Sequence, residues 1–165
     1  LITEDRRGNG IFGCLSIKDN VGVSIYNKHL KAGFVLDHKT INAIVDDSIQ
    51  KLRIKTPNMQ EHISNLSGGN QQKVIVARWL ANDPDILIMD EPTRGIDVGA
   101  KHEIYEIMND LAAEGKAIIM ISSEMAELLG MSDRVYVMCN GKMRGEITER
   151  VEMTQEHVMN YATQF

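Results

Sequence analysis

The chain has 165 residues, of which 43% are hydrophobic and 25% charged, and its formal net charge is −5. This balance is ordinary for one folded globular domain, and it argues against both intrinsic disorder and a positive field that would attract nucleic acid. No apolar run approaches the roughly 20 residues that cross a bilayer, and Cys14 and Cys139 stand in no metal-binding or redox motif.

The N-terminal segment predicts a short strand at Leu1 and Ile2 followed by a loop over residues 3–12, which are rich in charge and glycine. On these residues alone, a functional loop and a plain surface turn with an ion pair between Asp5 and an arginine are equally good interpretations of this segment.

Residues from about 11 to 80 predict a mainly helical unit. Apolar residues at helical spacing indicate one helix over residues 16–30 and another over residues 40–52. Residues 31–38 read as a linker between them. Pro57 ends the second helical pattern, because proline restricts the residue before it and cannot continue a helix.

A third helix is predicted from Ser67, which is a good N-cap residue. Gly68 and Gly69 leave backbone N–H groups uncovered in its first turn, so the hydrogen bonds and the helix dipole favour an anion such as phosphate there. The apolar pattern indicates that at least half of this helix is buried, with Trp79 in the core. A bulky residue at Gly69 is expected to cover the N–H donors and to abolish function while leaving the fold intact.

A strand is predicted over residues 86–89, whose continuous apolar run is typical of a strand covered on both faces of a parallel sheet. Asp90 and Glu91 follow at its carboxyl end, where open α/β sheets bind their ligands. Two carboxylates at this place suit a metal ligand and a base.

The rest of the chain alternates helix and strand in the pattern of a parallel βαβ unit and then forms a hairpin. Asn140-Gly141 is the hairpin signal, since both positions of a type I′ turn need positive φ. The predicted elements are a helix over 98–113, a strand over 117–121, a helix over 124–131, a strand over 134–138, a strand over 142–147 and a helix over 154–161.

In this order and spacing, the motifs resemble those of the ABC-type ATPases. Ser67, Gly68, Gly69 and Asn70 look like the signature loop, and residues 86–90 look like the Walker B strand. The resemblance implies an α/β fold, namely a partial P-loop NTPase core with a parallel sheet plus a mainly helical subdomain. It also implies ATP and Mg²⁺ as cofactors.

The resemblance assigns a role to each motif residue. Glu91 is the expected catalytic carboxylate and Asp90 the expected ligand of the Mg²⁺ on ATP. The signature residues are expected to act on ATP bound to the partner half. Gly95 and Asp97 lie in a segment similar to the D-loop, through which paired ATPase halves touch.

Two positions depart from the usual ABC pattern. Glu4 stands roughly where other ABC ATPases have the glutamine that approaches the attacking water, and Ser123 stands where they have the switch histidine. A serine is too short to hold the γ-phosphate as imidazole does. The site that contains Glu91 is therefore expected to be the weaker of two sites in the intact protein.

The sequence contains no GxxxxGK[ST] motif, so the loop and lysine that grip the triphosphate are expected to precede Leu1 in a longer protein. On this reading residues 1–165 are one ABC ATPase domain without its P-loop. Residues 11–80 form the helical subdomain, and residues 82–165 carry Walker B, the D-loop and the switch. The isolated fragment is expected to be inactive.

The Thr-Glu-Asp-Arg stretch from Thr3, together with the signature and the Asp-Glu-Pro-Thr stretch from Asp90, resembles the C-terminal ATPase half of bacterial simple-sugar importers, most of all those for galactose and methyl galactoside. The implied function is ATP hydrolysis for monosaccharide import at the cytoplasmic side of the inner membrane. The implied partners are the N-terminal ATPase half, the membrane-spanning permease subunits and, indirectly, a periplasmic sugar-binding protein. Nucleic acid is not among them.

Two alternatives stay open from the residues. One is a soluble tandem ABC ATPase that acts on the ribosome or on DNA, and the other is a nucleotide-binding module without hydrolysis. Ribosome- or DNA-dependent activity would favour the first, whereas nucleotide binding without turnover would favour the second.

Overall fold

The computed structural model describes residues 1–163. They form two compact units, Leu1–Ile121 and Ser122–Phe165. The predicted helical part, residues 11–80, and core part, residues 82–165, are a division by role and stay a prediction. The last two residues of the core part lie outside the described residues.

The first unit holds four α-helices and four strands among its described elements. Along the chain these are η1 (Arg6–Gly10), α1 (Ile17–Gly22), η2 (Tyr26–Lys28), β1 (Leu30–Lys31), β2 (Val35–Leu36), α2 (His38–Lys51), η3 (Ile63–Asn65), α3 (Gly68–Leu80), β3 (Ile86–Asp90), α4 (Val98–Ala113) and β4 (Ala117–Ile121). Of these, η1 is a π-helix, and η2 and η3 are 3₁₀ turns.

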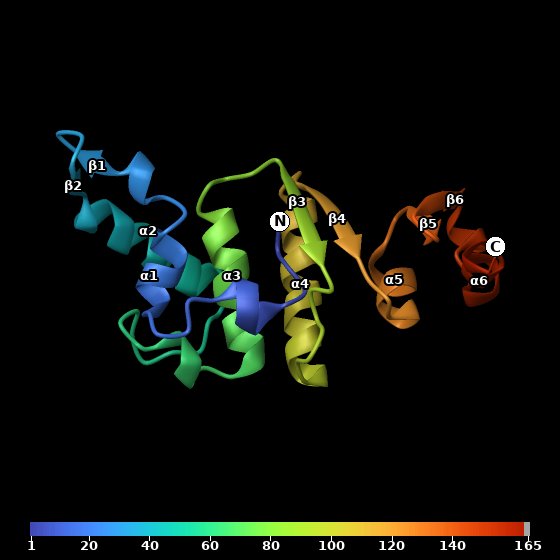
Figure 1. The fold of residues 1–165 in the computed structure, drawn as a ribbon, viewed down its shortest axis with the longest axis horizontal. Helices are drawn as coiled ribbons and strands as arrows, with labels where there is room; N and C mark the ends of the chain where they lie inside the picture. Colours follow the sequence, from blue (N-terminus) through green and yellow to red (C-terminus); the bar gives the residue numbers. More distant parts are fainter. Residues whose placement is uncertain (164–165) are drawn as a thin grey trace. The chain divides into compact units, whose positions relative to one another are not determined.

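Helix α3 is the most buried element of the first unit. It packs against α1, α2 and α4, and α1 and α4 lie on different sides of it (Figure 1). Every residue from Gln71 to Arg78 is buried, including the polar ones. Ser67 is its N-cap, as predicted, with extended backbone angles and a side chain that accepts from the Asn70 N–H.

Strands β3 and β4 pair in parallel, in register from Ile86 opposite Ala117 to Asp90 opposite Ile121. Helix α4 connects them and contacts β4, so the predicted βαβ unit is confirmed. Ile2 forms a parallel bridge to Met89 on the other edge of β3. This bridge confirms the extended start of the chain and makes β3 the central strand of the described sheet.

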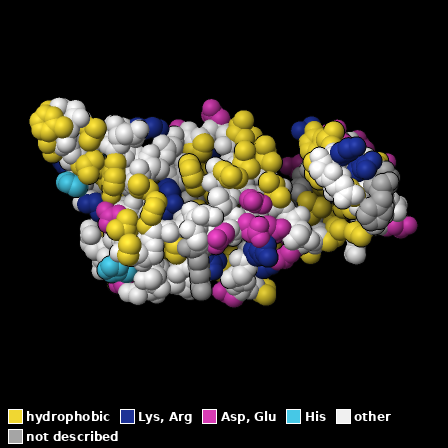
Figure 2. Space-filling model, viewed as in Figure 1, with side chains coloured by type: hydrophobic (Ala, Val, Ile, Leu, Met, Phe, Trp, Pro, Cys, Tyr) yellow, Lys and Arg dark blue, Asp and Glu magenta, His cyan; other side chains and the backbone are white. Residues whose placement is uncertain are grey.

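The expectation that β3 is covered on both faces is wrong for the described residues. Leu87 and Met89 are buried, whereas Ile86 is 58% and Ile88 36% exposed, because side chains alternate across a strand. Figure 2 shows hydrophobic side chains gathered over this strand. Within the first unit, residues 1–121, the face of the sheet that carries Ile86 and Ile88 is exposed.

The helix predicted over residues 16–30 is also wrong in length. Ser16 caps α1 as expected, but the helix ends at Gly22. A Cβ atom at Gly22 would meet the ring of Tyr26, so the close approach of this ring depends on glycine. The Tyr26 hydroxyl donates to Asp19 at 2.8 Å, and this bond holds the chain in its turn.

Two segments expected to be irregular have regular structure. The linker over residues 31–38 contains a small antiparallel hairpin, with Leu30 opposite Leu36 and a turn in which Ala32 and Gly33 have positive φ. The loop over residues 3–12 contains the π-helix η1, where the Asp5 side chain accepts from the Gly8 N–H at 2.8 Å.

The second unit contains a hairpin and two short helices. Its elements are α5 (Met125–Met131), β5 (Val135–Cys139), β6 (Lys142–Ile147), η4 (Arg150–Glu152) and α6 (Gln155–Ala162). Asn140 and Gly141 have φ of 50° and 73°, which confirms the predicted turn. Strand β5 pairs antiparallel with β6, and a core of Val135, Val137 and Ile147 joins the hairpin to α6.

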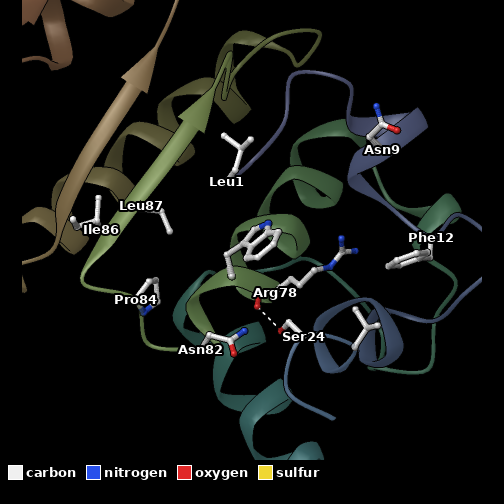
Figure 3. A pocket seen from close by; sticks show the side chains of 11 residues that line it. Leu1, Asn9, Phe12, Ser24, Arg78, Asn82, Pro84, Ile86 and Leu87 are labelled. Carbon is white, nitrogen blue, oxygen red and sulfur yellow. Dashed lines mark hydrogen bonds between the residues drawn. The ribbon is translucent and has the colours of Figure 1, made fainter. Parts of the chain in front are cut away.

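The sequence indicated that Trp79 lies in the core, and this is wrong. Its side chain is 38% exposed at the edge of a cavity of about 520 Å³. The buried residue beside it is Arg78, which points toward Phe12 from the cavity wall (Figure 3). Helical periodicity did not distinguish the two, because a long arginine stem packs as an apolar group does.

Arg78 connects three segments of the first unit. Its guanidinium donates to the Gly10 carbonyl at 2.8 Å and to the backbone and side-chain oxygens of Asn20 at 2.5 and 2.7 Å. Its carbon Cζ lies 5.0 Å from the centre of the Phe12 ring. Burial lowers the pKa of Arg78, since these partners carry no full negative charge.

We expect Arg78→Met to lower the free energy of unfolding by about 3 kcal/mol, because the methionine removes the hydrogen bonds to the Gly10 and Asn20 carbonyls and to the Asn20 side chain. Urea unfolding followed by the fluorescence of the single tryptophan measures this change. Arg134→Met is the matched control, since Arg134 also stacks on a ring, that of Tyr136 at 5.1 Å, but its side chain is 58% exposed. Equal losses in the two variants would contradict this role of Arg78.

Candidate functional site

Acidic residues gather where β3 ends. Asp90 is the last residue of the strand, and its N–H donates to the Ile2 carbonyl at 2.9 Å. Glu91 follows, and its N–H donates to the Ile121 carbonyl at 2.8 Å. These bonds hold the two residues at the carboxyl edge of the sheet, where Figure 2 shows acidic side chains close together.

The backbone of Glu91 is strained. Its φ is 47°, in the left-handed region that non-glycine residues seldom adopt, at a cost of order 1–3 kcal/mol. The other such residues of the described chain, among them Asn140 and Ala32, lie in turns or just after helices. Glu91 adopts this conformation where β3 ends, and its carbonyl accepts from the Arg94 N–H at 3.1 Å, so it begins the turn that follows the strand.

Glu4 belongs to the same edge. It follows Ile2, the neighbour of β3, by two residues, and its carboxylate forms an ion pair with Arg94. Both side chains are about half exposed, so the pair adds little stability. The structure therefore brings Glu4, Asp90 and Glu91 to one end of the sheet, and the roles predicted for them stay predictions. The sequence placed Arg94 at the start of the segment similar to the D-loop, but it did not indicate the ion pair with Glu4.

The first turn of α3 is held from two sides. The Asn70 amide donates to Ser67 Oγ at 2.9 Å and its oxygen accepts from the Lys55 N–H at 2.8 Å. Asn70 thus orients the N-cap residue and fixes the segment before α3 against it. Ser67 remains exposed at the helix N-terminus, where the helix dipole favours an anion.

Gly69 has a role in packing that the sequence did not indicate. It is buried, and a Cβ atom there would overlap the Cβ of Ala100 on α4. The expectation that a substitution at Gly69 leaves the fold intact is therefore wrong. Gly68 differs, because a Cβ atom there would meet only the end of the Arg6 side chain at 3.1 Å. The small-residue run from Val98 to Ala100 was the available signal for this close approach.

The predicted D-loop leads directly into α4. Gly95 has a φ of 68° and is exposed, and Asp97 is the N-cap of α4, where its side chain accepts from the Ala100 N–H at 2.9 Å. Ala100, which packs against Gly69, is thus also the residue whose N–H donates to the Asp97 cap. The signature and the D-loop segment meet at Ala100.

Ser123 lies in the second unit and is exposed. Beside it, Ser122 donates to the buried Glu127 at 2.5 Å and accepts from the Glu124 N–H at 3.0 Å. The segment after β4 is therefore ordered by a serine and two carboxylate residues. The role predicted for Ser123 stays a prediction.

Comparison with known proteins agrees with this geometry. The family model described as ABC transporter matches residues 8–94, just over half of the chain. The chain belongs to the ABC transporter family.

A curated relative of this ABC transporter chain is the galactose/methyl galactoside import ATP-binding protein MglA of Clostridium tetani. It is 56% identical over 165 residues, which is 100% of this chain but 32% of the relative. The chain thus spans about a third of the length of that protein.

Solved structures show the same fold. An ATP-binding cassette of an ABC transporter has a TM-score of 0.74 at 21% identity, covering 89% of this chain and 62% of the cassette. The protein cbiO1 of Clostridium perfringens, part of an ABC transporter complex, has a TM-score of 0.76 at 23% identity, covering 96% of this chain and 60% of its own. The predicted α/β fold of the P-loop NTPase class is confirmed.

No group of three or more His, Cys, Asp or Glu side chains among residues 1–163 is arranged to bind a metal. Asp90 still suits Mg²⁺, which nucleotide enzymes bind through one or two carboxylates and the phosphates themselves. Within the same residues, no helix combines the length and apolarity needed to span a bilayer.

The contact between Gly69 and Ala100 predicts that substitutions at these two positions have coupled effects on the free energy of unfolding. Gly69→Ala should destabilise the protein by about 2 kcal/mol through overpacking. In an Ala100→Gly background the same change should cost less than half as much, because the overlap is gone. Gly68→Ala is the control and should be neutral or slightly stabilising in the helix. Chemical denaturation of the four variants and the wild type measures this coupling, and additive effects would contradict the packing role.

Proposed function

We propose that this chain is part of the ATP-hydrolysing subunit that powers import of a monosaccharide, most similar to the importers of galactose and methyl galactoside. The observation that carries the proposal is the pair of elements in the first unit: a capped glycine turn at α3 and two carboxylates at the end of β3. The 56% identity to MglA over the whole chain supports the choice of substrate class.

In this proposal the end of β3 supplies the hydrolytic chemistry. Glu91 polarises the attacking water or takes its proton, and Asp90 holds the Mg²⁺ that accompanies ATP, which stabilises the charge on the phosphates. The strained φ of 47° at Glu91 supports this role, because strain of this kind collects at active sites. Glu4 can only accept hydrogen bonds, whereas a glutamine can also donate them. Together with Ser123, it makes the ATP site that contains Glu91 weaker than the second ATP site of the intact protein.

The signature turn acts on a different nucleotide. Ser67, Gly68 and Gly69, with Asn70 orienting the cap, present donors to the γ-phosphate of ATP bound to the partner half. Gly95 and Asp97 touch that half through the D-loop. The partners are then the N-terminal ATPase half and the membrane-spanning permease subunits, with a periplasmic sugar-binding protein acting indirectly. This places the protein at the cytoplasmic side of the bacterial inner membrane.

The catalytic assignment is tested by Glu91→Gln in the full-length protein. We expect ATP binding to persist while turnover falls by about 10²- to 10⁴-fold, because a positioned base is lost and the side-chain volume is kept. Steady-state phosphate release and equilibrium binding of Mg-ATP measure the two quantities. Unchanged turnover would transfer hydrolysis to the other half, and binding without turnover in the wild type would favour the non-hydrolysing module.

The phosphate-binding assignment is tested at Gly68 rather than at Gly69. Gly68→Asp places a negative charge at the first helical position, where the helix dipole and the neighbouring Arg6 favour it, so the fold should be retained. The same charge repels a phosphate, so transport and ATP turnover should be lost. Gly68→Asn has nearly the same shape without the charge and should keep most of both. Sugar uptake by Gly68→Asp at the wild-type rate would contradict the anion site.

A further inference from the structure

Lys73 is the largest of the fully buried side chains in the described chain. A lysine is almost never buried to this degree unless it is paired. Its side chain is 2% exposed and its ammonium lies 2.8 Å from Glu103 Oε2 on α4. It also donates to the Arg53 carbonyl at 3.1 Å. The charge is therefore satisfied by a carboxylate from one helix and a carbonyl from the segment between α2 and α3.

Glu103 receives a second cation from the same segment. The Lys55 ammonium lies 3.1 Å from Glu103 Oε1, and the Lys55 side chain is 75% exposed. The pKa of Glu103 is lowered, first by the hydrogen bond from Lys73 and then by that from Lys55. The two lysines differ in exposure. The bond from Lys73 to Glu103 is shielded from water, whereas the bond from Lys55 to Glu103 is open to it.

This cluster stands next to both loops that the proposed function uses. Lys73 lies one helical turn after Gly69 and Asn70, and Glu103 lies one turn after Ala100, which Asp97 caps. The Lys55 N–H also holds Asn70 at 2.8 Å. A displacement of α3 along α4 would separate the buried Lys73 ammonium from the partly exposed Glu103 carboxylate, so the ion pair fixes where the signature turn stands relative to the D-loop.

We propose that Lys73 is a positioning residue: through its buried ion pair with Glu103 it locks the signature turn and the D-loop segment into one rigid body. This inference rests on the proposed function for its effect on turnover, but not for its effect on rigidity. An ion pair is suited to this purpose, because it favours a single register between two helices, whereas apolar contacts tolerate sliding.

The experiment uses the full-length protein with its permease subunits and three variants. Lys73→Met keeps the length of the side chain without its charge. Glu103→Gln removes the charge at the other end, at a side chain that is 37% exposed, so it tests the pair even if Lys73→Met fails to fold. Lys55→Met is the matched control, since it removes the exposed lysine from the same carboxylate.

The first readout is hydrogen exchange in peptides that cover residues 66–72 and 95–102. Lys73→Met and Glu103→Gln should speed exchange in both peptides together, because the two loops lose their common anchor, and Lys55→Met should change neither. The second readout is the steady-state kinetics of ATP hydrolysis. In the first two variants kcat should fall about 10- to 100-fold, as expected of misplaced catalytic groups. The KM for ATP should stay within about threefold, since the ATP is gripped mainly by a P-loop elsewhere.

Exchange that is unchanged, or altered equally by Lys55→Met, would overturn the positioning role whatever the kinetics show. A higher KM for ATP with an unchanged kcat in Lys73→Met and Glu103→Gln would overturn it as well. Absence of ATPase activity in the wild-type protein would contradict the proposed function instead. The exchange data would then still decide whether Lys73 joins the two loops.

Discussion

The close approach of α3 to α4 is the constraint on which the first unit depends. At Gly69 no side chain separates the two helices, and Ala100 fills the contact. One turn further along, the ion pair between the buried Lys73 and Glu103 crosses the same interface. The glycine that we propose to present an N–H to phosphate is therefore also a glycine that this packing requires.

The parallel pairing of β3 with β4 provides the second half of the site. It aligns the ends of the two strands, so that Glu91 is held by the Ile121 carbonyl and Asp90 by the Ile2 carbonyl. The strain at Glu91 is tolerated because the strand, the sheet neighbours and the loop that follows determine its backbone from every side. The sheet edge thus presents the carboxylates, while the contact between α3 and α4 holds the turn that begins α3.

Local signals in the sequence predicted local structure well. The caps at Ser16 and Ser67 and the turn at Asn140-Gly141 are confirmed, because each depends on hydrogen bonds or φ values within a few residues. The order of helices and strands predicted the parallel βαβ unit, and the resemblance to the ABC-type ATPases implied the fold class. Tertiary features were less accessible: α1 is shorter than its apolar spacing indicated because Tyr26 folds back on Gly22, and Trp79 faces a cavity while Arg78 is buried. The candidate carboxylates could be found from their place after a strand. The pairing of Glu4 with Arg94, of Gly69 with Ala100 and of Lys73 with Glu103 could not, since the two members of each pair lie far apart in the chain.

The central claim is that the α3 turn and the β3 carboxylates serve ATP in two different sites of one transporter. The most direct test is a structure of the full-length protein with Mg²⁺ and a non-hydrolysable ATP analogue. The account predicts one nucleotide whose γ-phosphate meets the N–H groups at Gly68 and Gly69, and a second whose Mg²⁺ lies at Asp90 with Glu91 facing the γ-phosphate. Nucleotide bound with both of these elements facing solvent would contradict it.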